Sequence, residues 1–413
     1  MKTSISFIVL LCLLISTNAL PQNLSNWKLN GQVQLRSEFD GRDFSNKTYP
    51  RTFATIRTRV GLETSVSEKI QFFVQMQDSR SFGQGTPTTF LSNLDLHQGF
   101  IKLFNPFDLD FEVQAGRFQM IYSTERFIGA SNWSHIGRSF DGVKFTIAPK
   151  NFNLDLFALT INDSQNPISN PTVGAYPHPA KETPSFSLYG FFKRNDLTEK
   201  SKLDLLAYYE VDRKDAKPDT NEINRFTVAA SYFGNYGDFS TIVEAAYQFG
   251  KIAGVDLGAY LISVQGAYKT GITTFTAGAD ILSGNDPKDP KKLSSYNVGY
   301  GTNHKFYGYM DYFPINAGGL GVNNFYLKAN FNPNDSKFSF ALDLHHFMSN
   351  QKALSGKNVF GQEIDLTVLY KFIQGTSITW GASVFLPGDL MKAIYSPRED
   401  LAYWSYVMIT ANL

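Results

Sequence analysis

Two arginines stand two positions apart in the stretch TIRTRVGLE at residues 55–63. Arg57 and Arg59 share one parity, and the apolar side chains of Ile56 and Val60 share the other. This period of two predicts a β-strand that points the two sets to opposite faces. Guanidinium groups stay charged at any relevant pH and pair well with carboxylates, so this face could guide anions. The alternative is that both arginines are ordinary charges balanced by nearby acidic side chains.

A second set of reactive side chains shares one parity of the segment 338–345, namely Ser339, Asp343 and His345. These are the components of a hydrolase site. Residues two apart on a strand lie about 7 Å apart along it, which is too far for a ready Asp–His hydrogen bond. No GxSxG nucleophile motif accompanies them. We therefore predict no enzyme, with a barrel hydrolase as a remote alternative, and the absence of metal-loop patterns predicts no metal or cofactor.

The elements that must position these residues are strands. Alternating polar and apolar residues recur from one end of the chain to the other, and we count about eighteen such segments. They lie near residues 27–36, 52–64, 70–77, 94–104, 110–115, 140–148, 152–158, 185–194, 202–212, 225–234, 238–249, 256–269, 271–282, 321–331, 338–345, 361–372, 375–386 and 401–413.

The connections between these segments are of two kinds. Turn-forming residues join many of them closely, as at 105–108 and 234–237. Longer connections intervene at 119–138, 162–183, 283–319 and 387–400. Short turns alternating with long loops are typical of an outer-membrane β-barrel, in which a last strand at the C-terminus pairs with the first. A row of soluble β-sandwich domains is the alternative, but it requires a boundary about every 100 residues, and none is visible.

The N-terminus, MKTSISFIVLLCLLISTNAL, has the pattern of a secretory signal peptide: Lys2, a short apolar run, then small residues. We predict cleavage after Ala19, which gives a signal peptide at 1–19 and a barrel at 20–413. The only cysteine, Cys12, lies in the signal. Removal of Lys2 leaves 37 basic residues, one fewer than the 38 of the full chain, against 37 acidic ones. Such a neutral chain lacks the basic footprint of a nucleic-acid-binding protein.

Composition supports the same fold class. Aromatic residues make up 15% of the chain, with 36 Phe and 21 Tyr, and no second apolar run is long enough for a transmembrane helix. We therefore predict an all-β protein, a transmembrane antiparallel β-barrel of about eighteen strands in the bacterial outer membrane. Its outer face would contact membrane lipid and lipopolysaccharide.

Two stretches contain motifs that are more specific than alternating polar and apolar residues. They are AGRFQMIYSTERFIGASNWSHIGRSFDGVKF at 115–145 and YGTNHKFYGYMDYF at 300–313. Their pieces Gly116-Arg117, Glu125-Arg126, Trp133, GRSFDG at 137–142, and His304 with Asp311 resemble the alginate export family of outer-membrane porins. The resemblance implies an eighteen-stranded barrel with an arginine-rich pore that passes an anionic polysaccharide, alginate or polymannuronate, without catalysis. It also implies a monomer that works with periplasmic export components. The 119–138 and 283–319 loops are our candidates for folding inward.

From these patterns and this resemblance we expect a set of pore-lining residues: Arg36, Arg57, Arg59, Arg117, Arg126, Arg138, Asp141, Lys144, His304 and Lys305. Arg117 shares the outward parity of its strand, so a bulge at Gly116 would have to turn it inward. Arg126 and Asp141 could instead anchor the 119–138 loop to the wall. The other transporter hypothesis is a general or sugar-uptake porin without polymer specificity. A structural barrel or an adhesin would have a lumen plugged by side chains.

Overall fold

The computed structural model describes residues 27–84, 93–147, 153–163, 185–213, 222–314 and 317–413. Within these residues, eighteen strands form one sheet. They are β1 (Trp27–Gly41), β2 (Arg51–Ser67), β3 (Ile70–Ser81), β4 (Leu94–Phe104), β5 (Glu112–Phe118), β6 (Phe140–Ile147), β7 (Leu154–Asp163), β8 (Ser185–Thr198), β9 (Ser201–Arg213), β10 (Glu222–Tyr236), β11 (Phe239–Ile252), β12 (Val255–Thr270), β13 (Thr273–Leu282), β14 (Val322–Phe331), β15 (Phe338–Met348), β16 (Val359–Ile373), β17 (Thr376–Pro387) and β18 (Ala402–Asn412).

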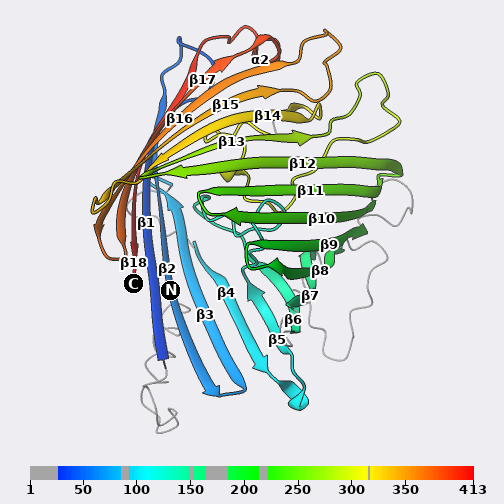
Figure 1. The fold of residues 1–413 in the computed structure, drawn as a ribbon, viewed down its shortest axis with the longest axis vertical. Coiled ribbons are helices and arrows are strands. Elements are labelled where there is room, and N and C mark those ends of the chain that lie inside the picture. The colour runs from blue at the N-terminus through cyan, green and yellow to red at the C-terminus, as the bar shows by residue number, and fades with distance from the viewer. Residues whose placement is uncertain (1–26, 85–92, 148–152, 164–184, 214–221, 315–316) are drawn as a thin grey trace, which may run out of the picture.

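The sheet closes on itself. Every strand pairs antiparallel with its neighbours in the sequence, and β18 pairs with β1. Figure 1 shows the blue first strand beside the red last strand. The predicted all-β barrel of about eighteen strands is therefore confirmed, whereas the predicted signal peptide at 1–19 lies outside the described residues.

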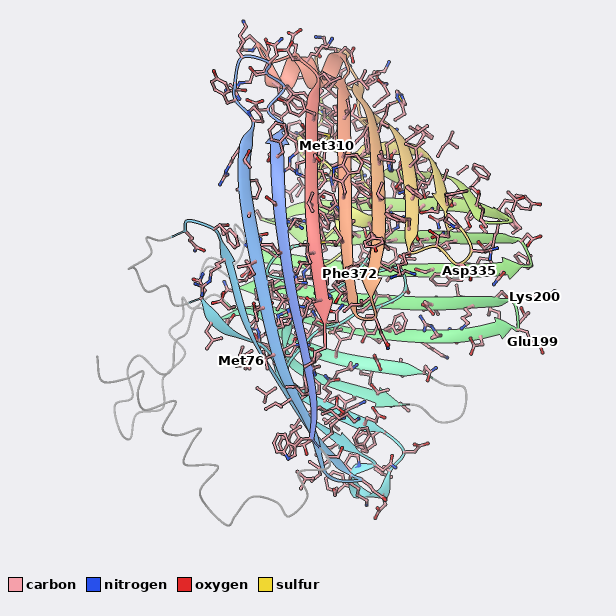
Figure 2. The ribbon with its side chains drawn as sticks, turned by 90° about the vertical axis from the view of Figure 1, so that its left-hand side faces the viewer. Met76, Glu199, Lys200, Met310, Asp335 and Phe372 are labelled. Atoms are coloured by element: carbon pink, nitrogen blue, oxygen red, sulfur yellow. The ribbon has the colours of Figure 1, made fainter. Side chains whose placement is uncertain are left out.

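The two ends of the barrel differ. Figure 2 shows the tight turns at Glu199–Lys200 and at Asp335 together at one end, which we call the turn end. The longer connections leave from the other end, the loop end, where the short helix α2 (Asp389–Tyr395) buries Leu390 and Met391. Two single turns of 3₁₀ helix, η2 (Pro106–Asp108) and η3 (Asn303–Lys305), complete the elements. None of the helices in the described ranges is long and apolar enough to cross a membrane.

The period of two along each strand sorts side chains between the outside and the interior. On β2, only 2% of Arg57 and 6% of Arg59 is exposed, against 51% of Val60 and 45% of Leu62. The outer face is accordingly apolar and the inner face polar, which is the pattern that a barrel needs when lipid surrounds it.

The interior is also packed with side chains from two connections. The β5–β6 connection and part of the β13–β14 connection contribute buried apolar groups, among them Ile128, Tyr307 and Phe313, to one cluster with the inner wall. Because these segments are apolar and aromatic, burying them inside the barrel removes them from water. The two connections therefore position the polar residues that they carry.

Candidate functional site

The connection between β5 and β6, which we name the first inner loop (residues 119–139), crosses the lumen. On one side, Arg57 of β2 donates hydrogen bonds to the carbonyl oxygens of Asn132 and Ser134, at 3.1 and 2.8 Å. On the other side, Arg126 forms ion pairs with acidic residues of β11 and β13. Because β2 and β11 lie half a barrel apart, the loop must span the interior. This agrees with our expectation that the 119–138 loop folds inward.

Arg57 and Arg59 hold this loop through neutral partners. Besides its bonds to the loop, Arg57 donates from Nη2 to Oε1 of Gln32 at 2.7 Å. Arg59 donates from Nη2 to the carbonyl of Ile136 at 3.0 Å and from Nε to Gln77 at 2.7 Å. Neither guanidinium forms an ion pair with a carboxylate in the described part of the chain. Both arginines therefore carry uncompensated positive charge while they position the loop backbone.

Arg36 on β1 joins the same cluster. Its Nε pairs with Oε1 of Glu38 at 2.8 Å, and its Nη1 donates to the carbonyl of Trp133 at 2.7 Å. The guanidinium carbon also lies 4.2 Å from the centroid of the Trp133 ring, a cation–π contact. Burial, with the nearby charges of Arg36 and Arg57, lowers the pKa of His135 in the same loop.

Arg126 anchors the far side of the loop. Its Nε bonds Oε2 of Glu244 at 2.7 Å, its Nη2 lies 3.1 Å from Oδ1 of Asp280, and all three side chains are buried. The guanidinium also stacks over Phe306, with its carbon 4.0 Å from the ring centroid. Burial opposes the charge, but the two carboxylates outweigh it and raise the pKa of Arg126. Arg126 therefore anchors the first inner loop to β11 and β13, and its acidic partners are Glu244 and Asp280 rather than its neighbour Glu125.

Part of the β13–β14 connection forms the second inner loop (residues 296–313). The His304 ring stacks on Trp133 of the first loop, with centroids 3.8 Å apart and planes 4° apart. Its Nδ1 lies 3.0 Å from Oδ1 of Asp311. Tyr309 stacks on the same histidine ring. Because Arg36 and His304 both contact the Trp133 ring, this indole links the second inner loop to β1.

Two further predicted residues, Lys305 and Arg138, tie the inner loops together. Lys305 pairs with Glu125, which also accepts a hydrogen bond from Oγ1 of Thr302 at 2.8 Å. Burial alone would raise the pKa of Glu125, but the hydrogen bonds from Lys305 and Thr302 outweigh burial and hold that pKa below its usual value. Nη1 of Arg138 donates to the carbonyls of Gly129 and Gly301, one from each loop, at 3.1 and 3.2 Å.

Arg117 and Asp141 do not line the lumen, and this corrects our expectation. They lie opposite each other on β5 and β6, in the same row as the outward residues Val74 of β3 and Thr160 of β7. The register of β5 runs without a shift, so no bulge at Gly116 turns Arg117 inward. The two side chains instead form an ion pair of 2.5 Å on the outer face.

Lys144 does face the interior. It lies opposite the buried Phe157 and 3.6 Å from Asp155, whose carboxylate also accepts a hydrogen bond from the Tyr122 hydroxyl of the first inner loop. Two similar pairs on this wall were not among our expected residues. They are Lys102–Glu112 at 2.6 Å and Arg194–Asp204 at 2.8 Å. Inward parity of their strands is the signal that could have identified them.

Asp343 and His345, which belong to the hydrolase alternative, do not contact each other but bond to residues of β14. Asp343 accepts a hydrogen bond from Lys328 Nζ at 2.6 Å, and Nδ1 of His345 lies 2.9 Å from Asn324 Oδ1. The described residues contain no group of three or more His, Cys, Asp or Glu side chains arranged to hold a metal ion. The inner wall therefore presents charges and hydrogen-bonding groups, which can attract and orient a passing solute.

Two acids on β16 escaped the sequence analysis. Glu363 and Asp365 are fully buried on the inner face, and each has one carboxylate oxygen without a hydrogen-bond partner among the described residues. Their other oxygens accept the backbone N–H groups of Met310 and Tyr309, at 2.8 and 3.4 Å. Their inward parity was readable, but their contact with the second inner loop was not. They fix this loop against the wall.

Solved structures of porins share this fold. A BenF-like porin from Pseudomonas fluorescens Pf-5 gives a TM-score of 0.62 at 11% identity, covering 94% of this chain and 99% of that one. Pseudomonas aeruginosa OccK8 (OprE) gives 0.61 at 12% identity, covering 94% and 98%. Pseudomonas aeruginosa OccK5 (OpdH) gives 0.60 at 14% identity, with the same coverage. No curated protein sequence matches the chain.

The family assignment comes from sequence. The profile of the family described as alginate export matches residues 26–399, which is nearly the whole described chain. That family and the porin fold indicate a channel rather than an enzyme, placed in the bacterial outer membrane. We conclude that this eighteen-stranded barrel belongs to the alginate export family.

Proposed function

We propose that this outer-membrane channel passively conducts an anionic polysaccharide such as polymannuronate. The observation that carries the proposal is the arginine cluster of β1 and β2. Arg36, Arg57 and Arg59 converge on the first inner loop, and among the described residues only Arg36 has a carboxylate partner, Glu38. Their net charge lies in a wall of low dielectric, where it raises the local concentration of anions more effectively than it would in open solvent.

The arginines act through their field, because all three are buried and most of their donors already bond the first inner loop or neighbouring wall residues. Direct contact with a saccharide falls to the half-exposed cations nearer the turn end, Lys102, Lys144 and Arg194. Each is paired with an acid on the next strand. Conduction requires binding that is favourable but weak, and these acids keep a bound carboxylate from staying.

The test is ion selectivity and polymer block of the refolded protein in a planar bilayer. We expect anion selectivity and transient block by oligomannuronate. A Lys102→Gln, Lys144→Gln double variant should reduce both, because it removes two accessible lumen cations without touching a contact of the arginines with the loop. The matched control is Lys288→Gln, Lys291→Gln, which removes the same charge from an exposed part of the β13–β14 connection.

A general porin is the second candidate, and one observation favours it. Lys102, Lys144 and Arg194 all have acidic partners, so this part of the wall carries little net charge. A large, weakly selective conductance that ignores oligomannuronate would establish this candidate and refute the polysaccharide channel. A double variant of Arg57→Glu and Arg59→Glu then reverses the arginine field and also removes the hydrogen bonds of both arginines to the first inner loop.

A further inference from the structure

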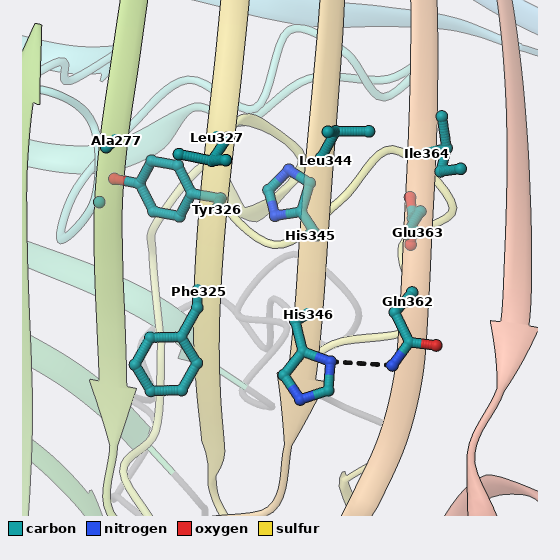
Figure 3. A pocket seen from close by; sticks show the side chains of 11 residues that line it. Ala277, Phe325, Tyr326, Leu327, Leu344, His345, His346, Gln362, Glu363 and Ile364 are labelled. Carbon is teal, nitrogen blue, oxygen red and sulfur yellow. Dashed lines mark hydrogen bonds between the residues drawn. The ribbon is translucent and has the colours of Figure 1, made fainter.

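A groove of about 570 Å³ lies on the outer face of the barrel, over strands β13 to β16 (Figure 3). Outward apolar side chains form its sides: Phe325 and Leu327 on β14, Leu344 on β15 and Ile364 on β16. The small side chain of Ala277 on β13 leaves room beside them. The groove has the volume and the apolar walls of a site for a small amphiphile.

Two polar side chains interrupt this apolar surface. His346 on β15 and Gln362 on β16 line the groove, and Nε2 of Gln362 lies 2.9 Å from Nδ1 of His346 (Figure 3). Because the amide nitrogen can only donate, Nδ1 accepts and the ring hydrogen sits on Nε2. Among the described residues, that Nε2–H has no hydrogen-bond partner. A donor facing hydrocarbon is unfavourable unless a ligand supplies an acceptor.

The order of polarity along the groove matches the order in a lipid. Figure 3 shows His346 and Gln362 at one end of the groove, beside Phe325, and the aliphatic Leu327, Leu344 and Ile364 at the other. β15 runs from the turn end at Phe338 to the loop end at Met348. His346 and Gln362 therefore lie at the end of the groove that is nearer the long loops. In an outer-membrane barrel these loops are external, so the polar pair faces the outer headgroups and the apolar end faces the membrane interior.

We propose that this groove binds one molecule of lipid A from the outer leaflet. An acyl chain occupies the apolar end, and a phosphate or hydroxyl oxygen of the headgroup accepts the hydrogen bond from Nε2 of His346. Lipid tails are as apolar as leucine, so the hydrophobic effect favours no particular tail. Selectivity comes from packing in the groove and from the hydrogen bond. This site depends on placement in the outer membrane and is independent of what the channel conducts.

The experiment is native mass spectrometry of the protein purified in a mild detergent and exposed to equal amounts of lipid A and phosphatidylethanolamine. We expect one retained lipid A per barrel. A His346→Leu, Gln362→Leu double variant should retain about fivefold less lipid A, the factor expected from one hydrogen bond. Ala277→Phe should have a similar effect by filling the groove while leaving the polar pair intact.

The matched control is Thr58→Leu, which changes another outward polar residue, opposite the exposed Val33 on β1 and far from the groove. It should retain lipid A like the wild type. Heat-modifiable mobility on gels verifies that each variant is folded. Equal retention by wild type and both groove variants overturns the proposal, as does a preference for phosphatidylethanolamine. A dimer or trimer that Ala277→Phe dissociates would also overturn it, because the groove would then be an interface between copies.

Discussion

The buried ion cluster of Arg126 offers a direct test of how the first inner loop is held. Arg126→Met keeps a side chain of similar length but leaves Glu244 and Asp280 buried without their cation. Breaking a buried pair by removing one partner costs about 3–5 kcal/mol. This cost raises the free energy of the state in which the loop is docked on the wall. The equilibrium between docked and released loop therefore shifts towards the released state by more than about a hundredfold.

Single-channel recording measures this shift, since a released loop changes the open area of the lumen. We expect Arg126→Met to show larger and noisier conductance than the wild type. A triple variant, Arg126→Met with Glu244→Gln and Asp280→Asn, should restore a quiet channel, because replacing a buried ion cluster with neutral groups is often neutral or stabilising. The control is Arg398→Met at the exposed loop end, whose pair with Asp43 spans 3.7 Å and contributes at most about 1 kcal/mol.

An unchanged conductance in Arg126→Met would refute the reasoning. It would mean that the arginines of β2 and the apolar packing hold the loop without the ion cluster. A triple variant as noisy as Arg126→Met would refute the part of the reasoning that attributes the noise to unpaired carboxylates. The loss would then come from the packing of the guanidinium on Phe306 rather than from unpaired carboxylates.

Two further predictions concern the contacts of the second inner loop, with Glu125 of the first inner loop and with Glu363 of β16. The pKa of Glu125 is held below its usual value, so its contacts stabilise the docked loops above the unfolded pKa and are lost as pH falls through the folded pKa. We expect gating noise to rise only at a pH below the ordinary glutamate pKa of about 4.3, and Glu125→Gln should show that noise already at neutral pH; a pH-independent channel would contradict this. Gly308 has φ +79°, and a Cβ there would lie 2.6 Å from the Glu363 carboxylate. Gly308→Ala should therefore destabilise the docked loop by more than about 1 kcal/mol, seen as faster proteolysis of the folded protein, and unchanged proteolysis would contradict it.

Much of the architecture was readable from the alternation of side chains. The segment 52–64 became the centre of β2, and the inward parity of Arg57 and Arg59 followed from the period of two. Parity also placed Arg117 outward. The expectation that it lines the pore came from the family resemblance and required a bulge that does not exist. Local pattern was the better guide there, because one residue of slip would reverse the whole strand.

The pairing of charges across the lumen could not be predicted in the same way. Arg126 and Glu244 are 118 positions apart, and the sequence around either residue does not predict contact with the other. The inner loops have no strand period to assign faces, and their docking is decided by tertiary packing. Strand parity could have shown that Glu244 and Glu363 face inward, but not which cation or backbone group each would meet.

Closure of the sheet makes folding an event of the whole chain. The side chains of Gln32 and Asn412 hydrogen-bond across the seam, 380 positions apart. Until β18 arrives, β1 presents a row of unpaired backbone groups, and such an edge recruits other chains. Bringing distant ends together also costs chain entropy before any contact repays it. A product that terminates before β18 would thus keep two open edges, which makes the last eleven-residue strand the step that converts an aggregation-prone sheet into an insertable pore.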